Sequence, residues 1–115
     1  MLTVASVNVN GVRAAYRRGM GSWLAARSPD VLALQEVRAE TSHLTELLGP
    51  GWHLAHAASA AKGRAGVAVA SRLPLAATRI GLGSAGEGPH GDGTGGAEGS
   101  GRWIEADVAL GDGRV

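Results

Sequence analysis

The chain has 115 residues, which allows one domain with a modest core, and its net charge of +1 by itself says little about partners. Hydrophobic residues make up 44%, but aromatic residues only 3% and phenylalanine is absent, so a core of Ala, Val and Leu should gain less than usual from burial. The lack of cysteine excludes a disulfide framework and thiolate metal sites. With neither a span long and apolar enough for a membrane nor a signal-peptide pattern at the start, we expect a cytoplasmic protein.

The first half of the chain alternates between strand and helix patterns. Residues 2–9 are small and β-branched and predict a strand. Residues 14–27 predict a helix with apolar side chains every three or four positions, although glycines within it weaken it by roughly 1 kcal/mol each. The apolar run 31–35 predicts a strand buried on both faces, and residues 41–48 predict a second helix.

The second half is rich in strand patterns. Strands are expected at 52–57, 66–71, 75–80 and 102–110. About half of residues 81–101 are glycine, a composition that cannot offset the entropy of ordering, so we expect a mobile loop there. The order of elements indicates an α/β domain. Residues 111–115 resemble a turn leading into a strand that does not follow, so we expect a truncated domain.

Polar side chains gather where the first two strands end. Asn8 and Asn10 lie at the end of the first strand and Glu36 directly follows the second. Sites in α/β sheets form at the carboxyl ends of strands, so we expect Asn8 and Glu36 to lie close together if the strands are neighbours. A carboxylate with an amide suits Mg²⁺, which prefers oxygen ligands. From the residues alone, turn chemistry at the asparagines and a loop carboxylate paired with Arg38 explain the pattern better than a metal site.

Histidines and arginines give weaker signals. We expect His43 on an exposed helix face, and His53 and His56 on opposite faces of a strand, so no histidine spacing favours a metal site. Arginines cluster in two stretches that lack acids, the first before Asp30. Such segments can bind phosphate backbones, but solvated arginines are the simpler interpretation.

Four segments, taken in order, resemble the exodeoxyribonuclease III and apurinic (AP) endonuclease family. They are residues 6–14 (SVNVNGVRA), 29–38 (PDVLALQEVR), 62–72 (KGRAGVAVASR) and 101–106 (GRWIEA). One such segment would be weak, but four in the family's order at plausible spacing are specific. Together they are spread from residue 6 to residue 106, on both sides of the glycine-rich stretch.

The resemblance implies the N-terminal part of the four-layered α/β sandwich of the endonuclease/exonuclease/phosphatase superfamily. It implies a DNA repair nuclease that hydrolyses phosphodiesters with Mg²⁺, or alternatively Mn²⁺, as 3′–5′ exonuclease and abasic-site endonuclease. Its partner would be double-stranded DNA, including abasic sites. By the same resemblance Glu36 is the metal carboxylate, Asn10 lies beside the metal, Asn8 is a catalytic amide near the scissile phosphate, and Arg13 lies at the DNA-facing rim.

The departures from the family pattern concern what the chain lacks. Family members are much longer, and their later motifs supply a Tyr, an Asp with an Asn, and a His that have no counterpart here. We therefore expect an incomplete and inactive fragment. Two alternatives stay open: a non-catalytic module that binds nucleic acid through its arginines, and a phosphatase of the same superfamily with a non-DNA substrate.

Overall fold

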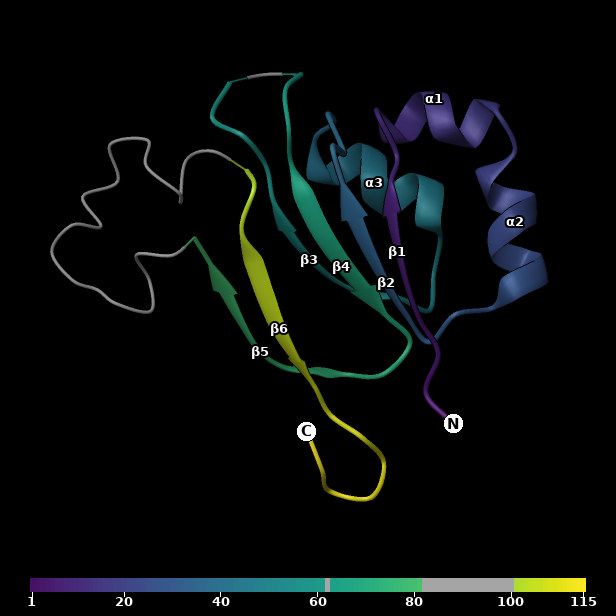
Figure 1. Cartoon of the computed structure of the whole chain (residues 1–115), viewed down its shortest axis with the longest axis vertical. Helices are drawn as coiled ribbons and strands as arrows, with labels where there is room; N and C mark the ends of the chain where they lie inside the picture. Colours follow the sequence, from purple (N-terminus) through teal and green to yellow (C-terminus); the bar gives the residue numbers. More distant parts are fainter. Residues whose placement is uncertain (62, 82–100) are drawn as a thin grey trace, which may run out of the picture.

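The computed structural model describes residues 1–61, 63–81 and 101–115, and it confirms the α/β class. The elements follow one another as β1 (Val4–Asn8), α1 (Val12–Arg17), α2 (Met20–Arg27), β2 (Val31–Gln35), α3 (Thr41–Leu48), β3 (His53–Ala57), β4 (Val67–Ser71), β5 (Leu75–Ile80) and β6 (Ile104–Val108) (Figure 1). Each predicted strand is present, close to its expected ends. The mobile loop expected at 81–101 lies outside the described residues, apart from its first and last glycines.

The single helix expected over residues 14–27 is wrong, because the chain breaks into α1 and α2 at Gly19. Gly19 adopts the left-handed conformation, with φ 108 and ψ 15. Its N–H donates to the Tyr16 carbonyl at 3.1 Å, and its own carbonyl accepts from Trp23 at 3.1 Å. A residue without Cβ reaches this conformation at little cost. The glycine expected only to weaken the helix therefore ends one helix and begins the next.

Four strands form the main sheet in the order β1-β2-β4-β3. β1 and β2 are parallel, whereas β4 runs antiparallel to both of its neighbours. One face of this sheet carries Leu32 and Leu34, which pack with Val12, Met20 and Leu44 from the three helices. In Figure 1 the strands β1 and β2 pass in front of α3, and α1 and α2 lie to the right of β1. None of the helices in the described part of the chain has the length and apolar character needed to cross a bilayer.

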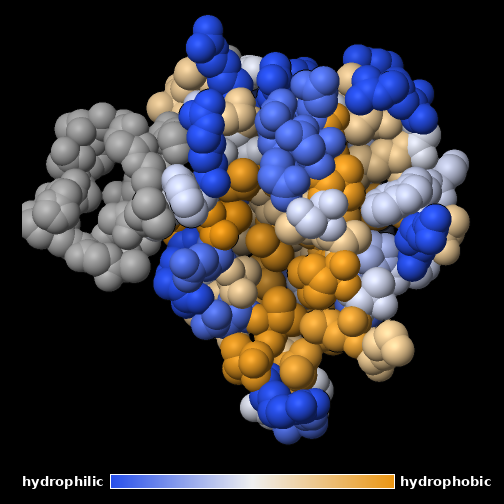
Figure 2. All heavy atoms as spheres, viewed as in Figure 1, coloured by the Kyte–Doolittle hydropathy of each residue, from blue (hydrophilic) through white to orange (hydrophobic). Residues whose placement is uncertain are grey.

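The face of the sheet away from the helices is more open. On β2, Ala33 and Gln35 point to this face and are only half-buried, so the strand is not buried on both faces as expected. The hairpin of β5 and β6 packs against β3 and β4. Figure 2 shows apolar residues over the lower part of this face and hydrophilic residues over the carboxyl ends of β1 and β2. The polar end of the open face is therefore where solutes can reach the strand ends.

One histidine differs from its expected position, and two agree with theirs. His43 is not on an exposed helix face: it is half-buried, and its Nδ1 is buried without a hydrogen-bond partner among the described residues. His53 is exposed and His56 half-buried, as strand alternation requires. The Thr41 hydroxyl lies 2.9 Å from His56 Nδ1, and burial lowers the pKa of His56. Helix α3 thus keeps its histidine partly buried instead of presenting it fully to solvent.

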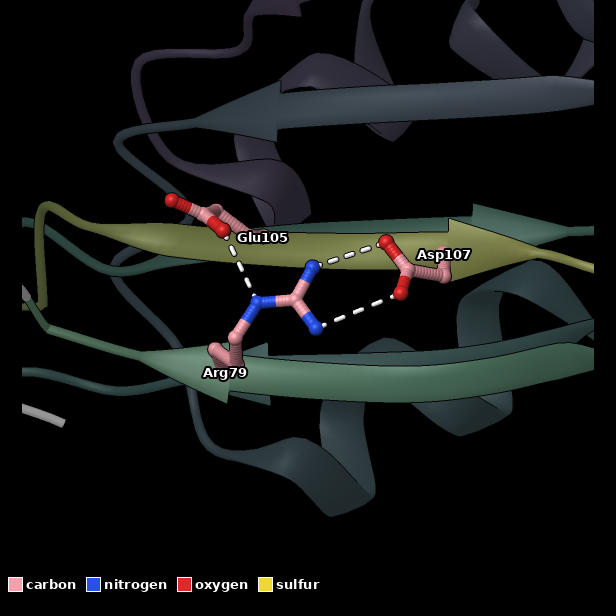
Figure 3. A network of polar contacts seen from close by, with 3 residues as sticks. All are labelled: Arg79, Glu105 and Asp107. Carbon is pink, nitrogen blue, oxygen red and sulfur yellow. Dashed lines mark hydrogen bonds and ion pairs between the residues drawn. The ribbon is translucent and has the colours of Figure 1, made fainter. Parts of the chain in front are cut away.

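The β5–β6 hairpin is joined by one arginine (Figure 3). The Arg79 guanidinium donates to Glu105 Oε1 at 2.9 Å and to the two carboxylate oxygens of Asp107 at 2.7 and 3.3 Å. This fork geometry is the favourable one for an arginine–carboxylate pair. The hydrogen bond from Arg79 lowers the pKa of Asp107. The pair therefore links the strand that precedes residues 82–100 to the one that follows them.

We predict that Leu34→Ala destabilises the fold by roughly 2–5 kcal/mol, because Leu34 is 1% exposed and its removal leaves a cavity. Chemical denaturation followed by circular dichroism measures the free energy of unfolding. Leu2→Ala is the matched control, since Leu2 is 44% exposed and should change stability by less than about 0.5 kcal/mol. Equal effects of the two substitutions would contradict the assignment of this core.

We predict that Arg79→Gln speeds amide hydrogen exchange in β5 and β6 at neutral pH. The folded pKa of Asp107 is lowered, so its ionised form stabilises the hairpin above its unfolded pKa, and this contribution is lost as pH falls through the folded pKa. The difference between variant and parent should shrink in acid. Arg114→Gln is the control, because its partner Asp112 lies beyond the strands. A protection pattern unchanged by Arg79→Gln would show that cross-strand backbone bonds alone hold the hairpin.

Candidate active site

The site begins with two parallel strands whose carboxyl ends meet. Asn8 at the end of β1 is in register with Gln35 at the end of β2. Past the strands the two chains stay paired, because Gly11 N–H donates to the Glu36 carbonyl at 2.8 Å and Val12 N–H donates to the Val37 carbonyl at 2.9 Å. The loop after β1 therefore lies directly beside the loop after β2.

Three residues of these loops have left-handed backbone conformations. The φ angles are 46 for Asn10, 54 for Glu36 and 53 for Arg38. Asparagine tolerates this region, but glutamate and arginine adopt it at a cost that surrounding contacts must offset. Here Val37 between them is fully buried, and the N–H groups of Val37 and Arg38 donate at 2.9 and 2.8 Å to carbonyls of the segment just before β4. The loop after β2 is thus hydrogen-bonded to the loop after β1 on one side and to the segment before β4 on the other.

The side chains converge on the Glu36 carboxylate. The Asn8 amide donates to Glu36 Oε2 at 2.7 Å, and the Arg38 guanidinium donates to Glu36 Oε1 at 3.0 Å. The expected proximity of Asn8 and Glu36 is confirmed. The backbone N–H of Asn10 donates to Asn8 Oδ1 at 3.0 Å and so orients the amide.

The other two candidates lie at the margin of this cluster. Asn10 contributes its backbone, and its side chain is exposed. Arg13 lies in the first turn of α1, and its Nη2 donates at 3.4 Å to the backbone carbonyl of Arg38, whose side chain contacts the carboxylate. The structure therefore brings Asn8 and Glu36 into contact and places Asn10 and Arg13 around them.

The electrostatics favour an ionised Glu36. Its pKa is lowered from the ordinary value of 4.5, first by the hydrogen bond from Asn8 and then by the hydrogen bond and charge of Arg38, with a smaller effect of Arg102. The carboxylate is therefore available as an anionic ligand at neutral pH.

The carboxylate opens into a depression of about 320 Å³, called here the site depression. Its walls are Asn8, Gln35, Glu36, Arg38, Ala65, Val67, Gly101 and Arg102. Glu36 is the only acid among these lining residues. Sequence reasoning did not assign Gln35 or Arg102 to the site, because Arg102 reaches it from the far side of residues 82–100.

A glycine fixes the approach of Arg102. Gly101 has φ 68, and its carbonyl accepts from Gly66 N–H at 2.8 Å. A Cβ at Gly101 would lie 2.6 Å from the backbone nitrogen of Ser59, so no other residue fits without movement of the backbone. The glycine before this arginine in the fourth family-like segment was a signal for this close approach.

The residues that line the site depression can supply part of the ligand set of a magnesium ion. No group of three or more His, Cys, Asp or Glu residues that could hold a metal ion occurs among the residues described. Mg²⁺, however, keeps several waters and often binds through one or two carboxylates together with substrate phosphates. Glu36 can supply one such carboxylate, with the positive side chains nearby suited to phosphate.

Comparison with known proteins identifies the class of fold and site. The pattern of the Endonuclease/Exonuclease/phosphatase family matches residues 5–109. The chain therefore belongs to the endonuclease/exonuclease/phosphatase family. A search of curated proteins found no match.

The chain is also similar to solved structures of two nucleases and a phosphatase. An AP endonuclease from Archaeoglobus fulgidus is 28% identical with a TM-score of 0.67, covering 95% of this chain and 38% of its own. A 3′–5′ exonuclease (NExo) from Neisseria meningitidis is 25% identical with a TM-score of 0.64, covering 94% and 37%. A 3′ phosphatase NExo from Neisseria, bound to product DNA hairpin, shares the fold at 23% identity and a TM-score of 0.64, covering 95% and 38%. The resemblance to the exodeoxyribonuclease III and AP endonuclease family is confirmed, over 37–38% of the length of these proteins.

We predict that the pKa of Glu36 lies below 4.5 in the folded chain and rises towards that value in Asn8→Ala and in Arg38→Gln. Because the folded pKa is lowered, ionised Glu36 stabilises the fold above its unfolded pKa, and this contribution disappears as pH falls through the folded pKa. Titration of the Glu36 carboxyl carbon by NMR measures the midpoint. Arg64→Gln should leave it unchanged. A midpoint at or above 4.5 in the parent chain would contradict the contacts described.

Proposed function

We propose that this chain forms part of a DNA repair nuclease of exodeoxyribonuclease III type. Its reaction would be Mg²⁺-dependent phosphodiester hydrolysis in duplex DNA, as 3′–5′ exonuclease and abasic-site endonuclease. The observation that carries the proposal is the 2.7 Å contact of Asn8 with Glu36 at adjoining carboxyl ends of parallel strands. Membership of the family and likeness to an AP endonuclease support the same class of reaction.

Each residue then has a proposed role. Glu36 would hold Mg²⁺, which when bound neutralises phosphate charge and activates water. Asn8 orients the carboxylate through Oε2, its own amide is fixed by the Asn10 N–H, and it would face the scissile phosphate. Asn10 would lie beside the metal. Arg38 and Arg102 line the same depression and would bind phosphate oxygens.

The surroundings of Arg38 support a polyanionic substrate. Arg38 also lines a cleft of about 400 Å³ with Arg13, His43 and Arg64, called here the basic cleft, in which Glu40 is the only acid among the lining residues. A third hollow beside it is lined by Arg13, Arg17 and Arg38. Three hollows that share one arginine give a continuous positive surface beside Glu36. A DNA backbone with several phosphates can follow such a surface.

We predict that the 115-residue chain binds an abasic-site duplex with an affinity that falls as salt rises, and that Arg13→Gln lowers both the affinity and the salt slope, by about 1 per lost phosphate contact. Fluorescence anisotropy at several salt concentrations measures both. Arg27→Gln is the matched control, because Arg27 is an exposed arginine of α2 that lines none of the three hollows. Mg²⁺ should strengthen binding in the parent chain but not in Glu36→Ala.

The same samples, incubated with Mg²⁺ or EDTA, test for cleavage. We expect none, because Glu36 is the only acid that the described residues place in the site depression and this chemistry needs several groups acting together. EDTA-sensitive nicking that disappears in Glu36→Ala would show that the chain, or a second copy of it, supplies the missing groups. DNA binding that changes neither with Mg²⁺ nor in Glu36→Ala would favour a non-catalytic module that binds nucleic acid. Absence of DNA binding at low salt would sink the proposed substrate and favour a phosphatase of the same superfamily.

A further inference from the structure

Both oxygens of the Glu36 carboxylate are engaged by side chains of this chain. Oε2 accepts from Asn8 at 2.7 Å and Oε1 accepts from Arg38 at 3.0 Å. Asn8 is neutral and donates only through its amide nitrogen, so it leaves the charge of the carboxylate in place. Arg38 brings a full positive charge to the oxygen that remains. A cation that binds at Oε1 must therefore compete with the guanidinium.

The backbone conformation of the loop after β2 places Glu36 and Arg38 in position to form this ion pair. Glu36 and Arg38 are two residues apart with φ angles of 54 and 53, and the fully buried Val37 lies between them. The N–H groups of Val37 and Arg38 are bonded to carbonyls of the segment before β4. Arg38 therefore starts from a fixed position, and less conformational entropy is lost in forming the pair than for two freely rotating surface residues.

The Arg38 side chain also borders a second hollow, into which it can move. Its side chain lines the site depression with Glu36 and, on its other side, the basic cleft with Arg13 and Arg64. Arg13 donates to the Arg38 carbonyl at 3.4 Å, which holds the backbone and leaves the guanidinium able to move. The Arg38 side chain is 46% exposed, so nearly half of its surface faces solvent in the paired position.

We propose that Arg38 is a built-in counter-ion that occupies the cation position beside Glu36 and is displaced into the basic cleft when the metal binds. The inference rests on the proposed metal role of Glu36. Arg38 is a positioning residue in this proposal: it weakens metal binding in the resting chain, and after displacement its charge is free for a phosphate. Metal and phosphate would then favour each other's binding, because each stabilises the displaced position of the same side chain.

The test measures metal affinity instead of activity. Free Mn²⁺ is followed by electron paramagnetic resonance during titration of the 115-residue chain at low and at high salt. Arg38→Gln should bind Mn²⁺ about two- to fivefold tighter at low salt, the range expected for loss of an exposed ion pair. The difference should shrink at high salt, where the pair is screened. Arg38→Lys should remain near the parent affinity because it keeps the charge.

Two control variants distinguish the counter-ion inference from a general effect of charge and from the proposed metal role of Glu36. Arg64→Gln removes the same charge from the basic cleft without contacting Glu36, and should leave the Mn²⁺ affinity unchanged. Glu36→Gln should lose the binding. Retained binding in Glu36→Gln would overturn the proposed metal role, and the counter-ion inference with it. Loss of binding there, combined with unchanged or weaker binding in Arg38→Gln, or with equal tightening in Arg64→Gln, would overturn the counter-ion inference alone.

A second measurement uses the parent chain and so does not depend on how a variant folds. During a Mg²⁺ titration, the NMR signals of the Arg38 side-chain N–H and of the Glu36 carboxyl carbon should shift with the same midpoint. This common midpoint is expected because one event, displacement of the guanidinium, changes both environments. An Arg38 side-chain signal that stays fixed while the Glu36 signal moves would overturn the inference.

Discussion

The parallel pairing of β1 with β2, carried past the strand ends by backbone hydrogen bonds, is the constraint on which the rest of the site depends. Two strands that merely ended side by side would leave their following loops free. Here Gly11 and Val12 bond to the carbonyls of Glu36 and Val37, so the loops remain in register. An amide from one strand and a carboxylate from the other are thereby fixed at 2.7 Å. The side-chain chemistry is thus a consequence of main-chain pairing.

This arrangement requires unfavourable backbone conformations in the loop after β2. Glu36 and Arg38 both take left-handed conformations that their side chains disfavour, by of order 1 kcal/mol or more each. Burial of Val37 and the hydrogen bonds to the segment before β4 offset that cost. A site held from both sides loses little entropy when a ligand arrives, which is the property that electrostatic stabilisation of a phosphate requires. The loop is therefore stabilised by contacts that lie outside it.

Charge is distributed unevenly around this loop. One carboxylate lies among arginines from three separate parts of the chain: Arg13, Arg38 and Arg102. These side chains occupy the polar end of a sheet face whose other end is apolar (Figure 2). Such a surface suits a phosphodiester far better than a neutral ligand, because cationic side chains and a hard cation both act on phosphate oxygens. Local electrostatics thus support the proposed class of substrate.

The sequence by itself determined the strands, since alternation and β-branching are local properties that survive in the fold. It also located Asn8, Asn10 and Glu36 at strand ends, and the family resemblance selected these residues from several polar candidates. Only the tertiary structure decided the break at Gly19, the burial of His43, the half-open β2, and the entry of Arg102 into the site depression. These features depend on contacts between distant parts of the chain. A short stretch of sequence does not include both partners of such a contact, so it does not predict them. At Gly19 the residue without Cβ reaches the left-handed conformation at little cost, and Met20, which follows it, packs in the core.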